Sequence, residues 1–368
     1  VSYGTTGNQG FNTNTAYRMY SKDSWTYYNG QWMTVYGLMH NQNRDMKWEI
    51  KKEFDVGLDF SLFNRRLNGR MDYFSRKIED AIYSGIPVAS PPAVYATSTV
   101  NIGDITNKGF EFELNGRVVD TKDWTFDTSL VGSFVGKSRL EGMAKDTHME
   151  FQAMPHGGGS AVRIFGGQEI GRYFLYRFAG VREEDGTPMI YSKDNKVIPY
   201  ASGTDEDRVQ TGNGLPKAVL SWNNTVRYRN WDLNLFFRSW LGQDVYNVTD
   251  MIQGVNCKIT EGQNLLRTAY RRNKAITNTD RLMLLDYWLE KGDFLKLDAV
   301  TLGYTLPRNK IKYVEKLRCY FTVRNVCTLT GYSGLDPEVN VNGLAPGFEG
   351  MSQYPRTRSF ILGIEIGF

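Results

Sequence analysis

The chain has 368 residues, with 44 Lys and Arg against 40 Asp and Glu, so its formal charge is only +4. This charge is too small for the length to indicate a nucleic-acid-binding protein. The chain contains 20 Phe, 22 Tyr and 8 Trp beside 37 Gly, although its mean hydropathy is negative. So many aromatic residues argue against disorder, and three cysteines are too few for a disulfide framework. No run of about 18 apolar residues predicts a membrane-spanning helix.

The dominant pattern is an alternation of apolar and polar residues at period two, which predicts strands with one apolar face. Nine segments show it, and residues 1–6 are expected to end a tenth strand. The segments are longer than the usual strand of about five or six residues. They match the tilted strands that cross a bilayer. The nine segments are residues 54–62, 67–73, 110–118, 124–134, 220–228, 231–238, 300–306, 317–324 and 360–368.

Short and long connections alternate strictly between these segments. The short links are residues 63–67, 120–123, 229–231 and 307–316, and the long links are 7–47, 80–104, 137–216, 242–292 and 329–355. Outer-membrane β-barrels have tight periplasmic turns and long extracellular loops. The pattern therefore predicts a transmembrane antiparallel barrel with a periplasmic C-terminus. A soluble β-sandwich also alternates in this way and remains an alternative.

The polar faces of these segments carry isolated charges of both signs among Gly, Ser, Thr and Asn, which suits a watery lumen. We expect nine charged residues to face that lumen. They are Arg70, Asp72, Glu111, Glu113, Arg227, Asp232, Arg238, Arg318 and Arg324.

The first long link is rich in aromatic residues, which stack on the apolar faces of sugar rings. We expect Trp25, Tyr27, Tyr28 and Trp32 to contact a substrate. The alternative is that these rings pack the loop against its neighbours or against a partner protein.

No catalytic arrangement of residues is found, so the sequence predicts a protein that is not an enzyme. His40, His148 and His156 form no metal-binding pair, so no transition metal is expected. The acidic residues 183–185 and 205–207 could hold Ca²⁺, but neither has the spacing of a known calcium loop. A solvated loop face is the simpler interpretation, and no cofactor is expected.

Several stretches resemble the SusC/RagA-like family of TonB-dependent outer-membrane transporters, in the family's order. They are VSYGTTGNQG at 1–10, NIGDITNKGFEFEL at 101–114, FLKLDAVTLGYTLP at 294–307, RNVCTLTGY at 324–332, LDPE at 335–338 and the closing 354–368. The resemblance implies a barrel of about 22 strands. It also implies an N-terminal plug, contact with the TonB complex and a SusD-like surface lipoprotein as partner.

On this resemblance, residues 1–368 form the C-terminal portion of the barrel, about ten strands, without the plug and the first strands. The implied function is import of a large nutrient, an oligosaccharide or a peptide, across the Gram-negative outer membrane. We expect the nine charged residues that face the lumen to contact the plug or the substrate. Two alternatives stay open: a small autonomous outer-membrane pore or adhesin, and a soluble carbohydrate-binding sandwich. The sequence does not identify the substrate.

Overall fold

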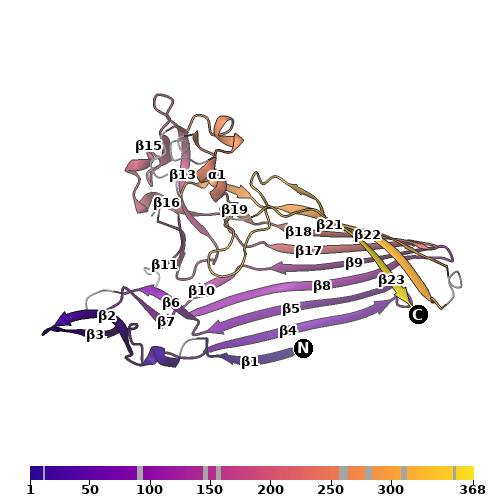
Figure 1. The fold of residues 1–368 in the computed structure, drawn as a ribbon, viewed down its shortest axis with the longest axis horizontal. Coiled ribbons are helices and arrows are strands. Elements are labelled where there is room, and N and C mark those ends of the chain that lie inside the picture. The colour runs from indigo at the N-terminus through magenta and orange to yellow at the C-terminus, as the bar shows by residue number, and fades with distance from the viewer. Residues whose placement is uncertain are drawn as a thin grey trace.

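The computed structural model describes residues 1–10, 13–88, 94–143, 148–154, 159–256, 264–277, 284–307, 313–350 and 354–368. Figure 1 shows one long curved sheet, with the long connections gathered at one end of its strands. None of the helices within these ranges has the length and apolar composition needed to span a bilayer.

The main sheet contains ten long antiparallel strands, and each pairs with the strands before and after it in this order. The ten predicted strands are therefore confirmed, including the one at the N-terminus. The strands are β1 (Ser2–Asn8), β4 (Glu49–Leu62), β5 (Leu67–Glu79), β8 (Asp104–Asp120), β9 (Trp124–Val135), β17 (Ala218–Tyr228), β18 (Trp231–Leu241), β21 (Phe294–Thr305), β22 (Lys316–Thr330) and β23 (Ser359–Gly367). A short strand, β10 (Arg139–Glu141), also pairs with β8.

One face of this sheet is apolar and exposed. Cross-strand partners share a face, so Met71 opposite Phe112 and Leu302 opposite Phe321 lie on the same side. On β23, Leu362 is 79% exposed and Ile364 is 64% exposed. An apolar surface that continues over ten strands is typical of contact with membrane lipid.

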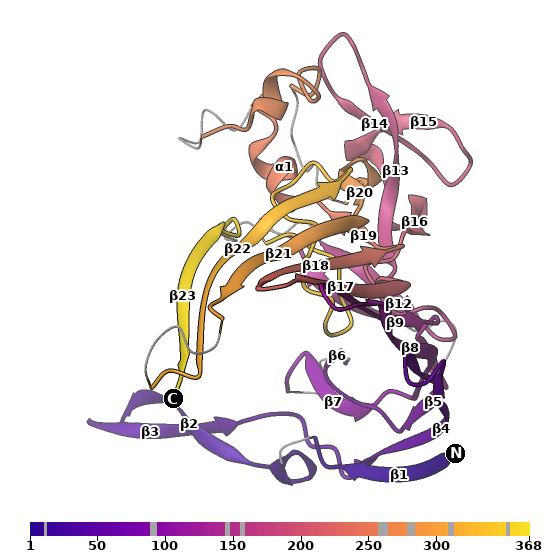
Figure 2. The ribbon, with the colours of Figure 1, turned by 90° about the vertical axis from the view of Figure 1, so that its right-hand side faces the viewer.

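The sheet remains open. Figure 2 shows it as an arc that ends at β1 on one side and at β23 on the other. Within the described residues, β1 pairs only with β4 and β23 only with β22. A β-sandwich would have two facing sheets. One continuous sheet in chain order instead is a section of a barrel wall.

The short connections lie at one end of the strands and the long connections at the other (Figure 1). Three of the long connections fold together into one unit, the loop body, which comprises the described residues of 137–216, 242–292 and 331–350. Its central sheet has the order β11 (His148–Ala153), β12 (Ser160–Phe165), β13 (Tyr173–Val181), β14 (Pro188–Tyr191) and β15 (Val197–Pro199), and β16 (Arg208–Thr211) also pairs with β13.

The remaining elements of the loop body come mainly from its second connection. Strand β19 (Asp244–Tyr246) pairs with β20 (Leu289–Lys291), and the helix α1 (Val248–Gln253) begins after Asn247, whose side chain accepts a hydrogen bond from Asp250 N at 2.9 Å. Short 3₁₀ turns cover Tyr200–Ser202, Asp205–Asp207, Arg267–Tyr270 and Asp286–Trp288. The core of the loop body is closed to solvent: five of its side chains have no exposed surface, Val162, Ile164, Tyr173, Leu175 and Trp288.

The first two long connections form hairpins instead. The first contains a 3₁₀ turn (Thr13–Ala16) and the hairpin of β2 (Tyr20–Tyr28) and β3 (Gln31–Leu38). The second contains the hairpin of β6 (Ile82–Pro87) and β7 (Thr97–Asn101). In Figure 1 the β2–β3 hairpin lies at the far end of the molecule from the short turns.

Candidate functional site

The polar face of the sheet is hollowed where β1, β4, β5, β8 and β9 lie side by side. This inner hollow has a volume of about 800 Å³, and Arg70, Asp72, Glu111 and Glu113 line it. Arg70 Nε donates to Asp72 Oδ2 at 2.8 Å. Among the described residues, Glu111 accepts a hydrogen bond from Ser133 Oγ at 3.3 Å and Glu113 accepts one from Asn115 Nδ2 at 2.7 Å, and both donors are neutral. The hollow therefore presents more carboxylates than cations.

The other five predicted lumenal residues lie on the same face of the sheet, farther along the wall. Arg318 pairs with Asp232 at 2.6 Å across β21, and the ion pair passes over Gly303, where a Cβ would meet Asp232 Oδ1 at 2.5 Å. Arg227 lies 3.4 Å from Asp127. Arg324 is on this face by its register opposite Ala299. The nine residues thus share one face, and only the first four line the inner hollow.

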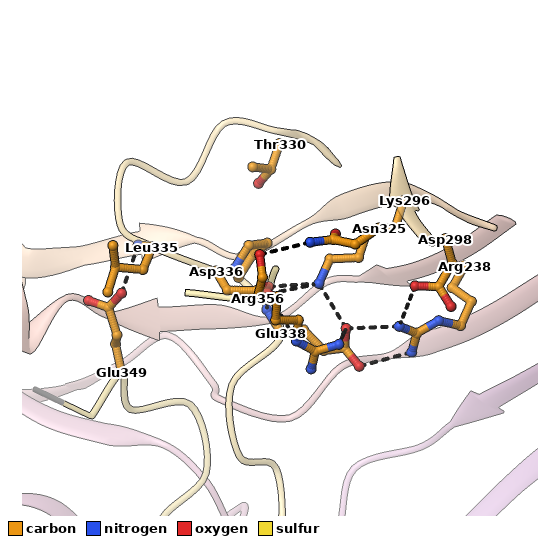
Figure 3. A network of polar contacts seen from close by, with 12 residues as sticks. Arg238, Lys296, Asp298, Asn325, Thr330, Leu335, Asp336, Glu338, Glu349 and Arg356 are labelled. Atoms are coloured by element: carbon orange, nitrogen blue, oxygen red, sulfur yellow. Dashed lines mark hydrogen bonds and ion pairs between the residues drawn. The ribbon is translucent and has the colours of Figure 1, made fainter. Parts of the chain in front are cut away.

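Arg238 belongs to a charge cluster that fixes the last long connection to the wall (Figure 3). We use charge cluster for Arg238, Lys296, Asp298, Asp336, Glu338 and Arg356. Lys296 Nζ lies 2.8 Å from Asp336 Oδ1 and 2.9 Å from Glu338 Oε2. Arg238 reaches Glu338 at 2.9 Å and Asp298 at 3.2 Å. Arg356 reaches the same two loop carboxylates, Asp336 at 3.1 Å and Glu338 at 2.9 Å.

The Lys296 side chain is only 2% exposed, so its charge is compensated by protein groups rather than by bulk water. Burial raises the pKa of the Glu338 carboxyl, but the hydrogen bonds from Arg238 and Lys296 outweigh burial and hold the pKa below its usual value. The cluster therefore keeps residues 335–338 against the inner face of β18 and β21.

Tyr173 joins all three connections of the loop body. Its hydroxyl lies 2.9 Å from Asp244 O and 2.8 Å from Gly347 O, and the residue is fully buried. Burial raises the pKa of this hydroxyl well above its usual value, so it remains a donor at any ordinary pH. The three connections therefore behave as one folded unit.

The β2–β3 hairpin places most of its aromatic side chains on one face. The register pairs Trp25 with Thr34 and Tyr27 with Trp32, and Tyr36 shares the face of Trp32 by alternation along β3. A bulge at Asp23 in β2 brings Tyr20 to the same side. The aromatic face is therefore Tyr20, Trp25, Tyr27, Trp32 and Tyr36, each at least 56% exposed.

Two contacts support the assignment of this face: the Tyr27 and Trp32 ring centres lie 5.4 Å apart, and the Lys22 ammonium lies 4.1 Å from the Trp25 ring. Tyr28 pairs with Gln31 and lies on the opposite face. Of the four aromatic residues proposed as substrate contacts, three are thus together and Tyr28 is apart.

The acidic loops are neutralised by arginine and lysine. Asp205 accepts from Arg208 at 3.0 Å and also pairs with Arg163. Asp185 pairs with Arg182, and Glu206 with Lys193. Within the described ranges no group of three His, Cys, Asp or Glu residues is arranged to hold a metal ion. His40 and His148 lie in different connections and contact different partners, Asn14 O and Glu150, and His156 lies outside the described residues. The expectation that no cofactor is bound stays a prediction, with Ca²⁺ in these loops as its alternative.

Sequence reasoning missed Lys296, Asp336 and Glu338. Lys296 stands in an alternating strand and looks like an ordinary solvated residue. The sequence signal that could have pointed to this cluster is the pair of carboxylates in LDPE at 335–338, which would favour a nearby cation if the segment packs against the wall.

A single curved sheet with an exposed apolar outer face and a charged inner face defines a section of a membrane β-barrel. The family model described as "TonB dependent receptor-like, beta-barrel" matches residues 1–326. The chain belongs to this family, whose members are outer-membrane proteins.

Individual relatives agree. TonB-dependent receptor P3 of Formosa agariphila is 27% identical over 402 residues, which cover 100% of this chain and 39% of the receptor. TonB-dependent receptor SusC of Bacteroides thetaiotaomicron is 26% identical over 358 residues, which cover 89% of this chain and 32% of SusC. The chain thus spans well under half the length of these receptors.

Among solved structures, the RagAB peptide transporter matches with a TM-score of 0.79 at 19% identity, over 100% of this chain and 40% of that one. At this identity the likeness shows the fold.

Proposed function

We propose that this chain is the C-terminal part of the barrel of a TonB-dependent importer, and that the complete protein takes up a large nutrient. The observation that carries the proposal is the wall itself: ten consecutive strands, apolar outside and charged inside, with a folded loop body at one end only. Energy would come from the TonB complex acting on a plug inside the complete barrel. The chain breaks no bond of its substrate.

The substrate class is an oligosaccharide or a peptide. The name of the RagAB peptide transporter supports the peptide, and the exposed aromatic rings of the β2–β3 hairpin, which can stack on sugar rings, support the oligosaccharide. We propose a SusD-like surface lipoprotein as partner, placed over the long connections. The inner hollow, with its excess of carboxylates, would then face the plug or the passing substrate.

The test is uptake by cells that carry the complete gene and the neighbouring lipoprotein gene. Candidate oligosaccharides and peptides are supplied one at a time, with and without a functional TonB. Uptake of one class that disappears without TonB is expected. Uptake that is independent of TonB would contradict the proposal and favour a passive pore.

We propose that the long connections are extracellular and the C-terminus periplasmic. Single cysteines at Asn195 and at Lys122 test this in a variant whose three native cysteines are replaced by serine. Asn195 lies in the loop body and Lys122 in a short turn. A membrane-impermeant maleimide added to intact cells should label Asn195→Cys and leave Lys122→Cys unlabelled. Labelling of Lys122→Cys alone would reverse the orientation.

We further propose that Trp25, Tyr27 and Trp32 contact the substrate through their exposed faces. Trp32→Ala should weaken binding of a retained oligosaccharide by roughly tenfold, as removal of a stacking ring costs about 1–2 kcal/mol. Tyr28→Ala is the matched control, since Tyr28 is equally exposed but lies on the opposite face. Equal losses for both variants would show that the aromatic face is not the contact. If neither variant weakens substrate binding but Trp32→Ala weakens lipoprotein binding, the face docks the partner.

A further inference from the structure

A second hollow lies where the barrel wall meets the loop body. This mouth cleft has a volume of about 580 Å³ and lies at the loop ends of β9, β17 and β18, among the residues that follow β9 and β18 and those that precede β17. Four cations from four separate segments line it: Lys137, Arg172, Lys217 and Lys291. Three carboxylates, Glu169, Asp244 and Asp293, line it as well.

The three carboxylates of the mouth cleft already have partners within the protein. Asp244 is 10% exposed and binds Lys291 Nζ at 2.7 Å and Asn213 N at 2.9 Å. Glu169 is 15% exposed and pairs with Lys137. Asp293 accepts the Gly242 N–H at 2.5 Å. Because the lysine side chains remain mostly exposed, 64% for Lys137 and 78% for Lys291, the cleft presents cations to a solute.

The charges of these cations lower the pKa of the Glu169 carboxyl. Burial raises the pKa of its carboxyl, but the hydrogen bond from Lys137 and the nearby charges of Lys137, Arg172 and Arg139 outweigh burial, so the pKa is lower than usual. This partly buried carboxylate pairs with Lys137, and the charges of Arg172 and Arg139 act on it in the same direction. Four cations and three carboxylates line the mouth cleft, and this excess of positive charge favours a further negative group.

The backbone of Lys217 is fixed, but its ammonium forms no ion pair within the part of the chain that the structure describes. Its N–H donates to Leu241 O at 2.9 Å and its carbonyl accepts from Val135 N at 3.0 Å, so the backbone is fixed between two wall strands. Its stem packs on Gly242, where a Cβ would meet Lys217 Cδ at 2.9 Å and where φ is +82°. Among the described residues no carboxylate pairs with its ammonium. Arg172 makes one hydrogen bond there, from Nη2 to Gln210 O at 3.1 Å, and keeps further donors.

The mouth cleft lies on the route into the inner hollow. Lys217 shares a face of the β17 segment with Val219 and Ser221, and both of these line the inner hollow. A solute that moves inward along this wall passes the cationic cleft first and the acidic hollow afterwards.

We propose that the mouth cleft binds a carboxylate group of the solute, with Lys217 and Arg172 as the binding cations. This inference rests on the proposed import function and adds that the substrate is acidic. An acidic sugar such as a uronate and an acidic peptide side chain both supply such a carboxylate.

The test measures binding by calorimetry to the complete transporter in detergent, with two matched pairs of probes. Tetragalacturonate is compared with neutral maltotetraose, and hexaglutamate with hexaglutamine. We expect the acidic member of one pair to bind more tightly than its neutral match, and the pair that responds identifies the source of the carboxylate. Lys217→Gln should then weaken that binding roughly fivefold, as loss of one exposed charge-assisted contact does. Arg172→Gln should act in the same direction.

Lys122→Gln is the control, because Lys122 is an exposed lysine in a short turn at the other end of the wall. Heat-modifiable migration on gels shows that each variant is folded. Equal affinity within both pairs, no binding of any probe, or an unchanged affinity in Lys217→Gln would overturn the acidic subsite. If TonB-dependent uptake of a neutral nutrient persists in that case, the import function stands and only the subsite fails.

Discussion

The loop body and the β2–β3 hairpin extend from the same end of the sheet, but they treat their aromatic side chains in opposite ways. Trp288, Tyr173 and Tyr246 have no exposed surface, whereas Trp25 and Trp32 are more than half exposed. The loop body has a buried core, to which Ala81 and Ile102 of the second long connection also contribute. The aromatic rings of the hairpin pack into no core and remain exposed, which is typical of a surface that binds a ligand or a partner protein.

The largest expected effect is the loss of a core ring from the loop body. Trp288→Ala should lower the free energy of unfolding of the loop body by about 3–5 kcal/mol, because it leaves a cavity among fully buried neighbours. Hydrogen exchange of residues 159–181 in the folded barrel measures this. Trp32→Ala is the matched tryptophan control. If Trp288→Ala leaves exchange in the loop body unchanged, the body is not one cooperative unit.

The next effect concerns the attachment of the last connection to the wall. Glu338→Gln should cost about 3 kcal/mol, because Lys296 is buried and loses a charged partner. Arg356→Gln, at a side chain that is 46% exposed, should cost at most about 1 kcal/mol. Proteolysis of residues 331–350 reports both. Equal protection in the two variants would mean that the buried pair does not hold this loop.

The same cluster predicts a dependence on pH. Since the pKa of Glu338 is lower in the folded protein, its contribution is present above the unfolded value, about 4.3, and is lost as the pH falls from there through the folded value. Acid should therefore expose residues 331–350 to protease, and Glu338→Gln should reduce this change. Protection that is unchanged between neutral and acid pH would contradict the expectation.

A smaller effect is expected for the hydroxyl that joins the three connections. Tyr173→Phe keeps the ring but removes the one hydroxyl proton that the carbonyls of Asp244 and Gly347 share, which should cost about 1–2 kcal/mol, although Gly347 O still accepts from Tyr246 N. Thermal unfolding of the loop body measures it. Tyr191→Phe, in a half-buried strand position, is the control and should change little.

The smallest effect on stability is expected in the hairpin. Tyr27→Ala removes one edge-to-face contact and should destabilise the hairpin by about 1 kcal/mol, with no change in the loop body. Hydrogen exchange separates the two regions. A loss of protection that spreads from the hairpin to the loop body would show that the two regions are coupled and would remove the contrast between them.

The wall could be predicted from the sequence because one rule governs each of its strands. Alternation placed Arg70, Asp72 and Glu111 on one face, and the register agrees. The alternation of short and long connections predicted which end of the sheet carries the tight turns and which carries the long loops. The loop body could not be predicted, because its core forms from residues as distant as Tyr173 and Gly347, which no local period connects.

The candidate sites divide in the same way. The aromatic residues of the first connection were visible from composition. That Tyr28 faces away from Trp25 follows only once both are known to lie in the regular part of β2. The mouth cleft combines Lys137, Lys217 and Lys291, which are far apart in the chain and meet only through the fold.

The central claim is that one face of the ten-strand wall meets lipid and the other does not. Spin labels placed one at a time at residues 359–367 of the complete transporter, reconstituted in bilayers, test it most directly. The account predicts an alternation of period two, with high accessibility to oxygen dissolved in the lipid at Phe360, Leu362, Ile364 and Ile366 and low accessibility at the positions between them. Accessibility to lipid oxygen without this alternation, or accessibility to a water-soluble relaxing agent at the four apolar positions, would contradict it.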